Sequence, residues 1–178
     1  MPDPQRPPFI ANWRDIESPQ AHQYSGDDEA MCIGAPFGTH FGLDRIGIHH
    51  ERLLPGRRTS FPHAESEEEE FVYVIEGEPD VWIDGHLHRL RPGDAVGFPA
   101  GTGIAHSFLN NTEAEVHLLV VGEAAKPENR IFYPLNPERR PLREDWWDDH
   151  PTHSLGPHDG MTDKRRAEKT ARKAEGTG

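Results

Sequence analysis

The sequence is poor in cysteine, in basic charge and in long apolar runs, and each shortage excludes a class of protein. Its single cysteine, Cys32, cannot form a disulfide within the chain, which favours a reducing compartment and predicts a cytoplasmic protein. No apolar run approaches the ~20 residues that a membrane helix needs. The opening residues, MPDPQRPPF, lack the apolar centre of a signal peptide. We therefore expect neither a membrane span nor a secretory leader.

Positive charge is scarce, because 19 Lys and Arg residues stand against 31 Asp and Glu residues, giving a net charge of −12 at pH 7. A surface of this sign repels the phosphates of nucleic acids and the anionic headgroups of membranes. We therefore expect no nucleic-acid or membrane partner and predict a small-molecule ligand instead. The length of 178 residues predicts one domain with appended ends.

Turn-forming residues are abundant, with 17 Gly and 17 Pro. They separate short stretches rich in β-branched and aromatic residues, which is typical of an all-β fold. The stretch VWIDGHLHRL is the clearest hairpin, because Asp84-Gly85 suits a type I′ turn. The stretches AVGFP, AHSFLN and EVHLLVVGE follow as further strands. Strands at intervals of about 8–12 residues predict a β-sandwich or a β-barrel.

The most informative stretch is residues 56–77, GRRTSFPHAESEEEEFVYVIEG. Its first half is predicted to be a strand with His63 and Glu65 on one face, because side chains alternate along a strand. A second strand begins at Glu70. Pairing of these two strands would bring His63, Glu65 and Glu70 together, and His106 could join them from a later strand. Two imidazoles and two carboxylates that converge in this way form a divalent-metal site.

A plainer interpretation makes residues 65–70 a solvated acidic loop and the histidines ordinary polar residues of strands. Glu70 fits that interpretation poorly, because a carboxylate at the start of an inward-facing apolar strand is costly without a partner. Two neighbouring carboxylates would also repel each other, and one of them would tend to hold a proton. A divalent cation removes this conflict, so we favour the metal site.

The same stretch resembles the first conserved motif of the cupins. That motif runs Gly, five residues, His-x-His, three or four residues, Glu, six residues, Gly. Here His63 fits the first histidine, Glu65 stands where the second would be, and Glu70 and Gly77 fit the end. Gly56 lies one residue further from His63 than the motif asks.

A second stretch resembles the second cupin motif, which runs Gly, five residues, Pro-x-Gly, two residues, His, three residues, Asn. Gly93, Pro99 and Gly101 fit its first part, and His106 and Asn110 fit its end. The gap between Gly101 and His106 is two residues longer than the motif. Together the two motifs cover roughly residues 45–121.

The resemblance implies an all-β double-stranded β-helix (jelly-roll) barrel with irregular N- and C-terminal arms. We place the arms and the cupin barrel at residues 1–30 (N-terminal arm), 31–125 (barrel), 126–160 (extended C-terminal arm packing on the barrel) and 161–178 (charged mobile tail). Cupins often pair through edge strands, so the resemblance also implies a homodimer.

The resemblance implies a metal centre with three histidines and one glutamate. Glu65 in place of a histidine lowers the charge of that centre and shifts its preference toward Mn²⁺ or Fe²⁺, with Zn²⁺ still possible. Alternatively, Glu65 points aside and His63, Glu70 and His106 form the two-histidine, one-carboxylate set of non-haem iron sites.

Four further residues are candidates for the chemistry. Tyr73 and His117 could act as acid–base groups, and Arg52 and Arg57 could recognise a carboxylate or phosphate of the substrate. Each also has a plainer interpretation as a packed or surface residue. In the stretch IGIHHERL, His49 shares one strand face with residues 47 and 51, but the pattern does not decide which face points inward.

Cupins include isomerases, dioxygenases and decarboxylases, so the fold does not choose the reaction. The resemblance implies a metal-dependent enzyme that acts on a sugar derivative or an organic acid, as an isomerase, a lyase or decarboxylase, or a dioxygenase. The alternative is a cupin module that binds or senses a small molecule without turning it over.

Overall fold

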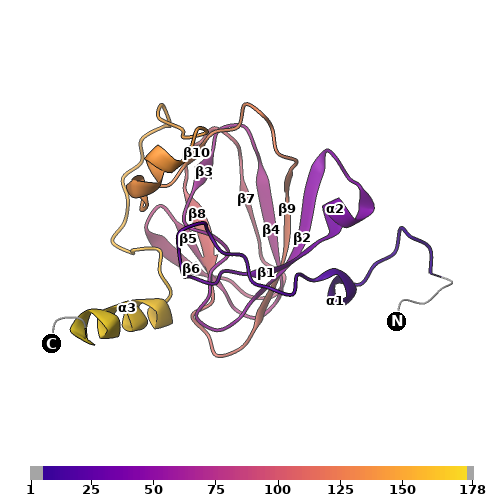
Figure 1. Cartoon of the computed structure of the whole chain (residues 1–178), viewed down its shortest axis with the longest axis horizontal. Coiled ribbons are helices and arrows are strands. Elements are labelled where there is room, and N and C mark those ends of the chain that lie inside the picture. Colours follow the sequence, from indigo (N-terminus) through magenta and orange to yellow (C-terminus); the bar gives the residue numbers. More distant parts are fainter. Residues whose placement is uncertain (1–5, 176–178) are drawn as a thin grey trace.

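The computed structural model of the chain describes residues 6–175, and its regular secondary structure consists mainly of strands in three sheets (Figure 1). The five-stranded sheet has the order β1 (Ile33–Pro36), β2 (Ile46–Leu53), β9 (Val116–Glu123), β4 (Glu70–Glu76), β7 (Ala95–Phe98). The three-stranded sheet has the order β6 (His86–Arg89), β5 (Asp80–Ile83), β8 (His106–Leu109), and the two-stranded sheet pairs β10 (Ile131–Phe132) with β3 (Ala64–Glu65). The β-rich fold is confirmed, but the pairing among these residues does not close the strands into one barrel.

The main hydrophobic core lies between the five-stranded and three-stranded sheets. On β4, Val72 and Val74 are buried, while the alternate residues Phe71, Tyr73 and Ile75 are exposed on the outer face. The inward valines pack with buried residues of β2, β5, β7, β8 and β9, namely Leu53, Val81, Phe98, Phe108, Val116 and Leu118. Strand alternation therefore fixes which side chains of β4 can take part in a site between the sheets.

The two halves of residues 56–77 do not pair with each other. The backbones of His63 and His106 exchange hydrogen bonds of 3.1 Å and 2.9 Å, which places the first half beside β8. Strand β4 pairs instead with β7 and β9. The predicted pairing is therefore wrong, because the acidic segment between the halves crosses from one sheet to the other. Its crossing is held by hydrogen bonds from Ser66 N to the Arg130 carbonyl and from Glu67 N to the Asn129 side chain.

The hairpin at Asp84-Gly85 is confirmed. Strands β5 and β6 pair antiparallel around it, and both turn residues have positive φ angles, 44° and 88°. Gly85 also lies against the C-terminal arm, because a Cβ atom there would lie 2.3 Å from the backbone nitrogen of Gly156. The turn thus needs glycine for its conformation and for the close approach of the arm.

The arms pack on the sheets through a few large side chains. Trp82 is fully buried and its indole Nε1 donates to the His158 carbonyl at 2.9 Å, while Trp147 joins the same cluster and is 5% exposed. The helical segments are α1 (Trp13–Ile16), α2 (Phe37–Phe41), the 3₁₀ helix η1 (Pro137–Leu142) and α3 (Asp163–Glu175). Within residues 6–175, no helix is both long and apolar enough to cross a membrane.

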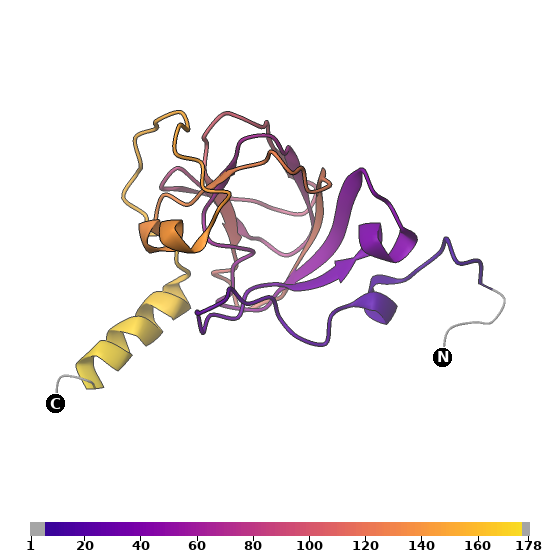
Figure 2. The ribbon, with the colours of Figure 1, turned by 45° about the horizontal axis from the view of Figure 1, so that its top comes forward.

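The segment predicted as a mobile tail forms helix α3, which extends away from the sheets (Figure 2). Its start is anchored by polar contacts rather than by an apolar face. Thr162 is fully buried and donates to the Gly56 carbonyl at 2.7 Å, and Arg165 is 9% exposed. The ends of the two predicted terminal segments, residues 1–5 and 176–178, lie outside the described residues.

Candidate metal centre

Three of the four predicted metal ligands converge between the sheets. His63 ends the segment beside β8, His106 begins β8, and Glu70 begins β4. One possible ligand atom from each lies within 4.8 Å of those of the other two. Because His63 and His106 face each other across a backbone bridge, their rings lie side by side with centroids 5.2 Å apart. Glu70 approaches them from the opposite sheet.

Hydrogen bonds and stacking orient both imidazole rings. Nδ1 of His63 lies 2.9 Å from the Phe61 carbonyl oxygen, which can only accept, so Nδ1 carries the proton and Nε2 keeps its lone pair. The His106 ring stacks on Phe98 with centroids 3.5 Å apart, and its Nε2 lies 3.2 Å from Glu70 Oε1. A backbone carbonyl behind a histidine is the usual way in which proteins orient a metal ligand.

The protonation states also suit a cation. Burial, followed by the neighbouring His106, lowers the pKa of His63 to about 4, so its ring is neutral at pH 7. Burial acts to raise the pKa of Glu70, but the hydrogen bond with His106 and the nearness of the imidazoles outweigh it, and the pKa is lowered. A neutral imidazole and an ionised carboxylate are the forms that bind metals.

Glu65 lies outside this convergent group. It belongs to β3, where it pairs with Ile131 of the C-terminal arm. Burial, then the charges of Glu68 and Glu70, raise the pKa of Glu65 to about 7. The arrangement corresponds to the alternative in which Glu65 points aside and two histidines and one carboxylate remain.

The two predicted acid–base residues lie away from the three ligands. Tyr73 is on the outer face of β4 and is 39% exposed. His117 lies on β9, with its Nδ1 3.1 Å from Nε2 of His50 and its ring edge toward Trp13. The structure therefore does not bring Tyr73 or His117 to the metal ligands.

The two predicted substrate-binding arginines are also engaged elsewhere. Arg52 forms ion pairs with Glu17 at 2.7 Å and with Glu115 at 2.9 Å. Arg57 donates from Nη1 to the carbonyl of Met31 at 3.3 Å. Arg52 thus fastens the N-terminal arm through Glu17, and Arg57 holds the segment that directly follows the arm.

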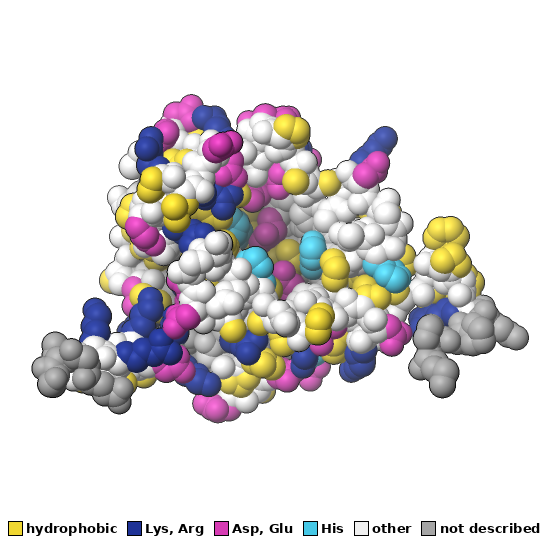
Figure 3. Space-filling model, in the orientation of Figure 1, with side chains coloured by type: hydrophobic (Ala, Val, Ile, Leu, Met, Phe, Trp, Pro, Cys, Tyr) yellow, Lys and Arg dark blue, Asp and Glu magenta, His cyan; other side chains and the backbone are white. Residues whose placement is uncertain are grey.

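A cavity of about 720 Å³ opens beside His63. It is lined by the N-terminal arm over residues 18–24, by β1 and β2, and by residues 59–63. Figure 3 shows that this molecule is hollowed near the centre of one face, with histidine and acidic side chains around the hollow. The cavity is large enough for a small ligand.

Glu51, which was not among the predicted site residues, lines this cavity together with His49. Its register with β9 places Glu51 opposite Leu118, a core residue, and so identifies the inward face of β2. Oε2 of Glu51 is buried without a hydrogen-bond partner. Burial, then the charge of Glu70, raise the pKa of Glu51 to about 7. The sequence showed that the residues of β2 alternate between two faces, but it did not show which face is buried.

Comparison with known proteins identifies the family of the chain. A family model for the cupin domain matches residues 49–122. Protein SchB of Streptomyces halstedii is 30% identical over 101 residues, which cover 57% of this chain and 68% of SchB.

Two solved structures are similar to this chain. A sugar phosphate isomerase of the cupin superfamily from Silicibacter pomeroyi is 36% identical with a TM-score of 0.55, over 57% of this chain and 64% of the other, which is less than two thirds of its length. A proposed sugar phosphate isomerase from Acidithiobacillus ferrooxidans is 27% identical with a TM-score of 0.63, over 71% and 81% of the two chains. By its two motifs, its β-rich fold and these similarities, the chain belongs to the cupin superfamily.

Proposed function

We propose that this cupin binds a divalent cation through His63, Glu70 and His106 and acts on a small polar molecule held in the adjoining cavity. The observation that carries the proposal is the meeting of three ligand atoms within 4.8 Å beside a cavity of about 720 Å³. Structural burial alone does not explain why two imidazoles and a carboxylate should converge at such a place.

The residues fit a first-row divalent metal. Two imidazole nitrogens and one carboxylate suit Mn²⁺, Fe²⁺ and Zn²⁺, and three protein ligands leave coordination positions for a substrate. When bound, the cation would supply Lewis-acid polarisation of a substrate oxygen. The Phe61 carbonyl and the Phe98 ring hold the two imidazoles in place for this role.

Among the reactions of cupins, we propose an isomerisation of a sugar derivative or a related hydroxy acid. Glu51 lines the same cavity as His63, and its pKa of about 7 suits a group that takes and returns a proton near neutral pH. In such a step the Glu51 carboxylate removes the proton from the hydroxyl-bearing carbon beside a carbonyl and returns it to the former carbonyl carbon, while the hydroxyl proton moves to the former carbonyl oxygen. The two similar sugar phosphate isomerases support this choice.

A binding or sensing module is the second candidate. Residues 18–24 line the cavity, and Asp28 and Glu29 a few residues later contact Arg165 of α3. A ligand that shifts the lining segment could therefore shift the helix without being changed itself.

Elemental analysis of untagged protein tests the metal centre. We expect about one divalent metal per chain in the parent protein, loss of metal in His63→Ala and retention in Glu65→Ala. Metal-free parent protein would contradict the proposal, and loss of metal in both variants would mean that Glu65 is a fourth ligand.

Exchange of substrate hydrogen with D₂O, followed by NMR over a panel of aldoses, ketoses and their acids, tests the reaction. Glu51→Gln should retain the metal and lose the exchange, because only the proton-transfer group is removed. A compound that binds the loaded parent protein without exchange or conversion would favour the sensing module.

We also propose that the two larger sheets are the halves of a double-stranded β-helix. We further propose that the protein is cytoplasmic and forms a homodimer. The exposed outer face of β4, with Phe71, Tyr73 and Ile75, supports pairing of two copies through this sheet. Light scattering on a Tyr73→Glu variant tests the dimer, which should dissociate if this face is the interface.

A further inference from the structure

A second hollow of about 660 Å³ adjoins the cavity beside His63. The two share His22, Gln23 and Tyr24 in their linings, so the N-terminal arm forms the wall between them. The far side of the second hollow is formed by the C-terminal arm, which contributes Arg139 and Arg143. An anionic group that enters the second hollow therefore lies beside both arginines.

Arg139 carries a charge that no acidic side chain between residues 6 and 175 neutralises by a direct ion pair. Its guanidinium lies over two aromatic rings, 4.8 Å from the centroid of Tyr24 and 5.2 Å from that of Phe61. Its Nε is buried and has no hydrogen-bond acceptor. A buried donor without an acceptor is costly. Because this Nε is enclosed, an acceptor on a ligand would bind the terminal nitrogens of the guanidinium.

Arg143 lies nearer to the metal ligands. Its Nη1 donates to the hydroxyl of Tyr133 at 3.2 Å, and the Tyr133 ring lies 5.8 Å from the ring of His63. Asp145 pairs with Arg143 and offsets part of its charge.

The two hollows differ in the cations that line them. The lining of the cavity beside His63 includes Glu51 and, among the described residues, no Lys or Arg. The lining of the second hollow includes Arg139 and Arg143 together with the carboxylates Glu144 and Asp145. Asp145 pairs with Arg143 and Glu144 is exposed, so Arg139 is the group in this lining toward which the anionic end of a ligand would be drawn.

We propose that Arg139, assisted by Arg143, is the anion-binding subsite of the cavity, and that the substrate carries a carboxylate or phosphate at the end remote from the metal. Arg presents a planar fork of donors that matches both groups. This inference depends on the proposed function only for the position of the metal. The anion-binding end depends on the contacts of Arg139 and Arg143.

Isothermal titration of metal-free protein with inorganic phosphate, and separately with succinate, tests the subsite. We expect saturable binding of at least one anion and about a tenfold or greater weakening in Arg139→Gln. Arg140→Gln is the matched control, because Arg140 lies on the same 3₁₀ helix but is exposed and paired with Asp148. Binding of phosphate alone or of succinate alone would identify the anionic group.

The proposal is overturned if neither anion binds, or if Arg139→Gln binds the anion as tightly as Arg140→Gln does. Far-UV circular dichroism and the unfolding midpoint establish that the variants are folded. If Arg139→Gln does not fold, Arg139→Lys keeps the charge but loses the fork, and a several-fold weakening is expected. His63→Ala should lose metal and keep anion binding, so failure of the metal centre and failure of the subsite are separate results.

Discussion

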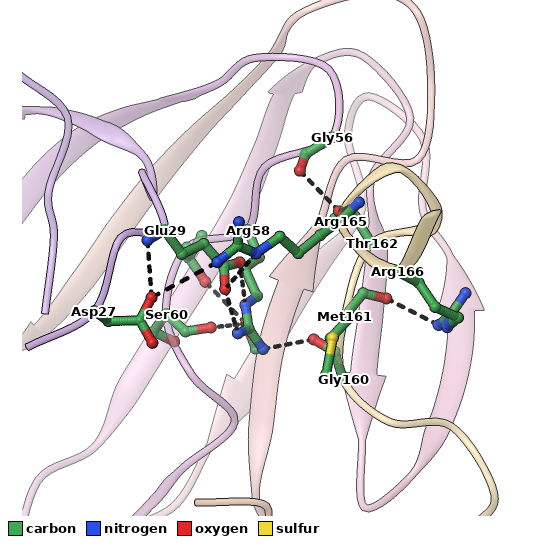
Figure 4. Close-up of polar contacts among 12 residues, drawn as sticks. Asp27, Glu29, Gly56, Arg58, Ser60, Gly160, Met161, Thr162, Arg165 and Arg166 are labelled. Carbon is green, nitrogen blue, oxygen red and sulfur yellow. Dashed lines mark hydrogen bonds and ion pairs between the residues drawn. The ribbon is translucent and has the colours of Figure 1, made fainter. Parts of the chain in front are cut away.

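The metal ligands and the polar cluster beneath helix α3 both place charged groups inside the protein, but they balance that charge differently. In the cluster, Arg58 and Glu29 are only 4% and 5% exposed and form a two-pronged pair with both distances 2.8 Å (Figure 4). Arg58 also donates to the Gly160 carbonyl at 2.7 Å. The chain itself supplies the opposite charge, so the cluster is structural.

At the metal ligands, acceptors face one another. His63 Nε2 keeps its lone pair and Glu70 is ionised, and the hydrogen bond between His106 and Glu70 satisfies only part of this set. In the proposed function, a divalent cation supplies the remaining positive charge. A buried charge that is paired within the fold therefore indicates stability, whereas convergent unpaired acceptors indicate a ligand.

Removal of a metal ligand should give the largest effect. In the parent protein, free Mn²⁺ at about 1,000 times its Kd should raise the free energy of unfolding by about 4 kcal/mol, since binding to the folded state alone is stabilising. In His106→Ala this stabilisation should disappear. Urea unfolding with and without Mn²⁺ measures both values, and equal stabilisation of the two proteins would rule out the site.

Breaking the buried ion pair of the polar cluster should have the second-largest effect on stability. Glu29→Ala leaves Arg58 buried without its partner and should cost about 3–5 kcal/mol of unfolding free energy, while metal content stays unchanged. The double variant Glu29→Leu/Arg58→Met removes both charges and should recover most of the loss. If the double variant were as unstable as the single one, lost packing rather than an unpaired charge would be the cause.

The effect of pH on the unfolding free energy of the metal-free protein should be smaller than these two effects. Burial, then His117, lower the pKa of His50 from 6.5 to about 4, and the residue is 4% exposed. The folded state therefore favours the neutral ring, so this stability is complete above pH 6.5 and is lost as the pH falls toward 4. The slope should be at most about 1.4 kcal/mol per pH unit from this group. Urea unfolding between pH 7 and 4 should show a shallower slope in His50→Gln, and an unchanged slope would contradict this assignment.

The smallest effect on stability should come from breaking the ion pair at the exposed edge of the polar cluster. Arg172 lies 2.7 Å from Asp28, but the two side chains are 65% and 61% exposed. Water and salt screen such a pair, so Arg172→Ala should leave the unfolding midpoint unchanged within error. A clear drop in that midpoint would show that the whole helix depends on this outer contact.

Much of the candidate site was accessible from sequence. His63, Glu70 and His106 were identified from residue type, spacing and the two motifs, and the hairpin at Asp84-Gly85 from its turn chemistry. These features depend on short stretches of chain, in which local preferences act directly. The strand partners of His63 and Glu70 were wrong, because pairing depends on contacts between distant segments, here with β8 and β9.

Other residues had no local signal. Glu51 could face either way until its register with β9 was known, since a strand pattern defines two faces but not which one is buried. Arg139 gains its importance from Tyr24 and Phe61, which are more than 70 residues away along the chain. The anchoring of α3 was missed for a related reason, because it depends on polar pairing with Glu29 and not on an apolar stripe.

Trp82 gives the protein a built-in optical reporter. Its indole is fully enclosed, and its Nε1 donates to the His158 carbonyl of the C-terminal arm. Detachment of that arm would expose the indole to water while the sheets stayed intact. The emission of Trp82, together with that of Trp147 in the same cluster, should then shift to longer wavelength, which allows docking of the arm to be followed without an added dye.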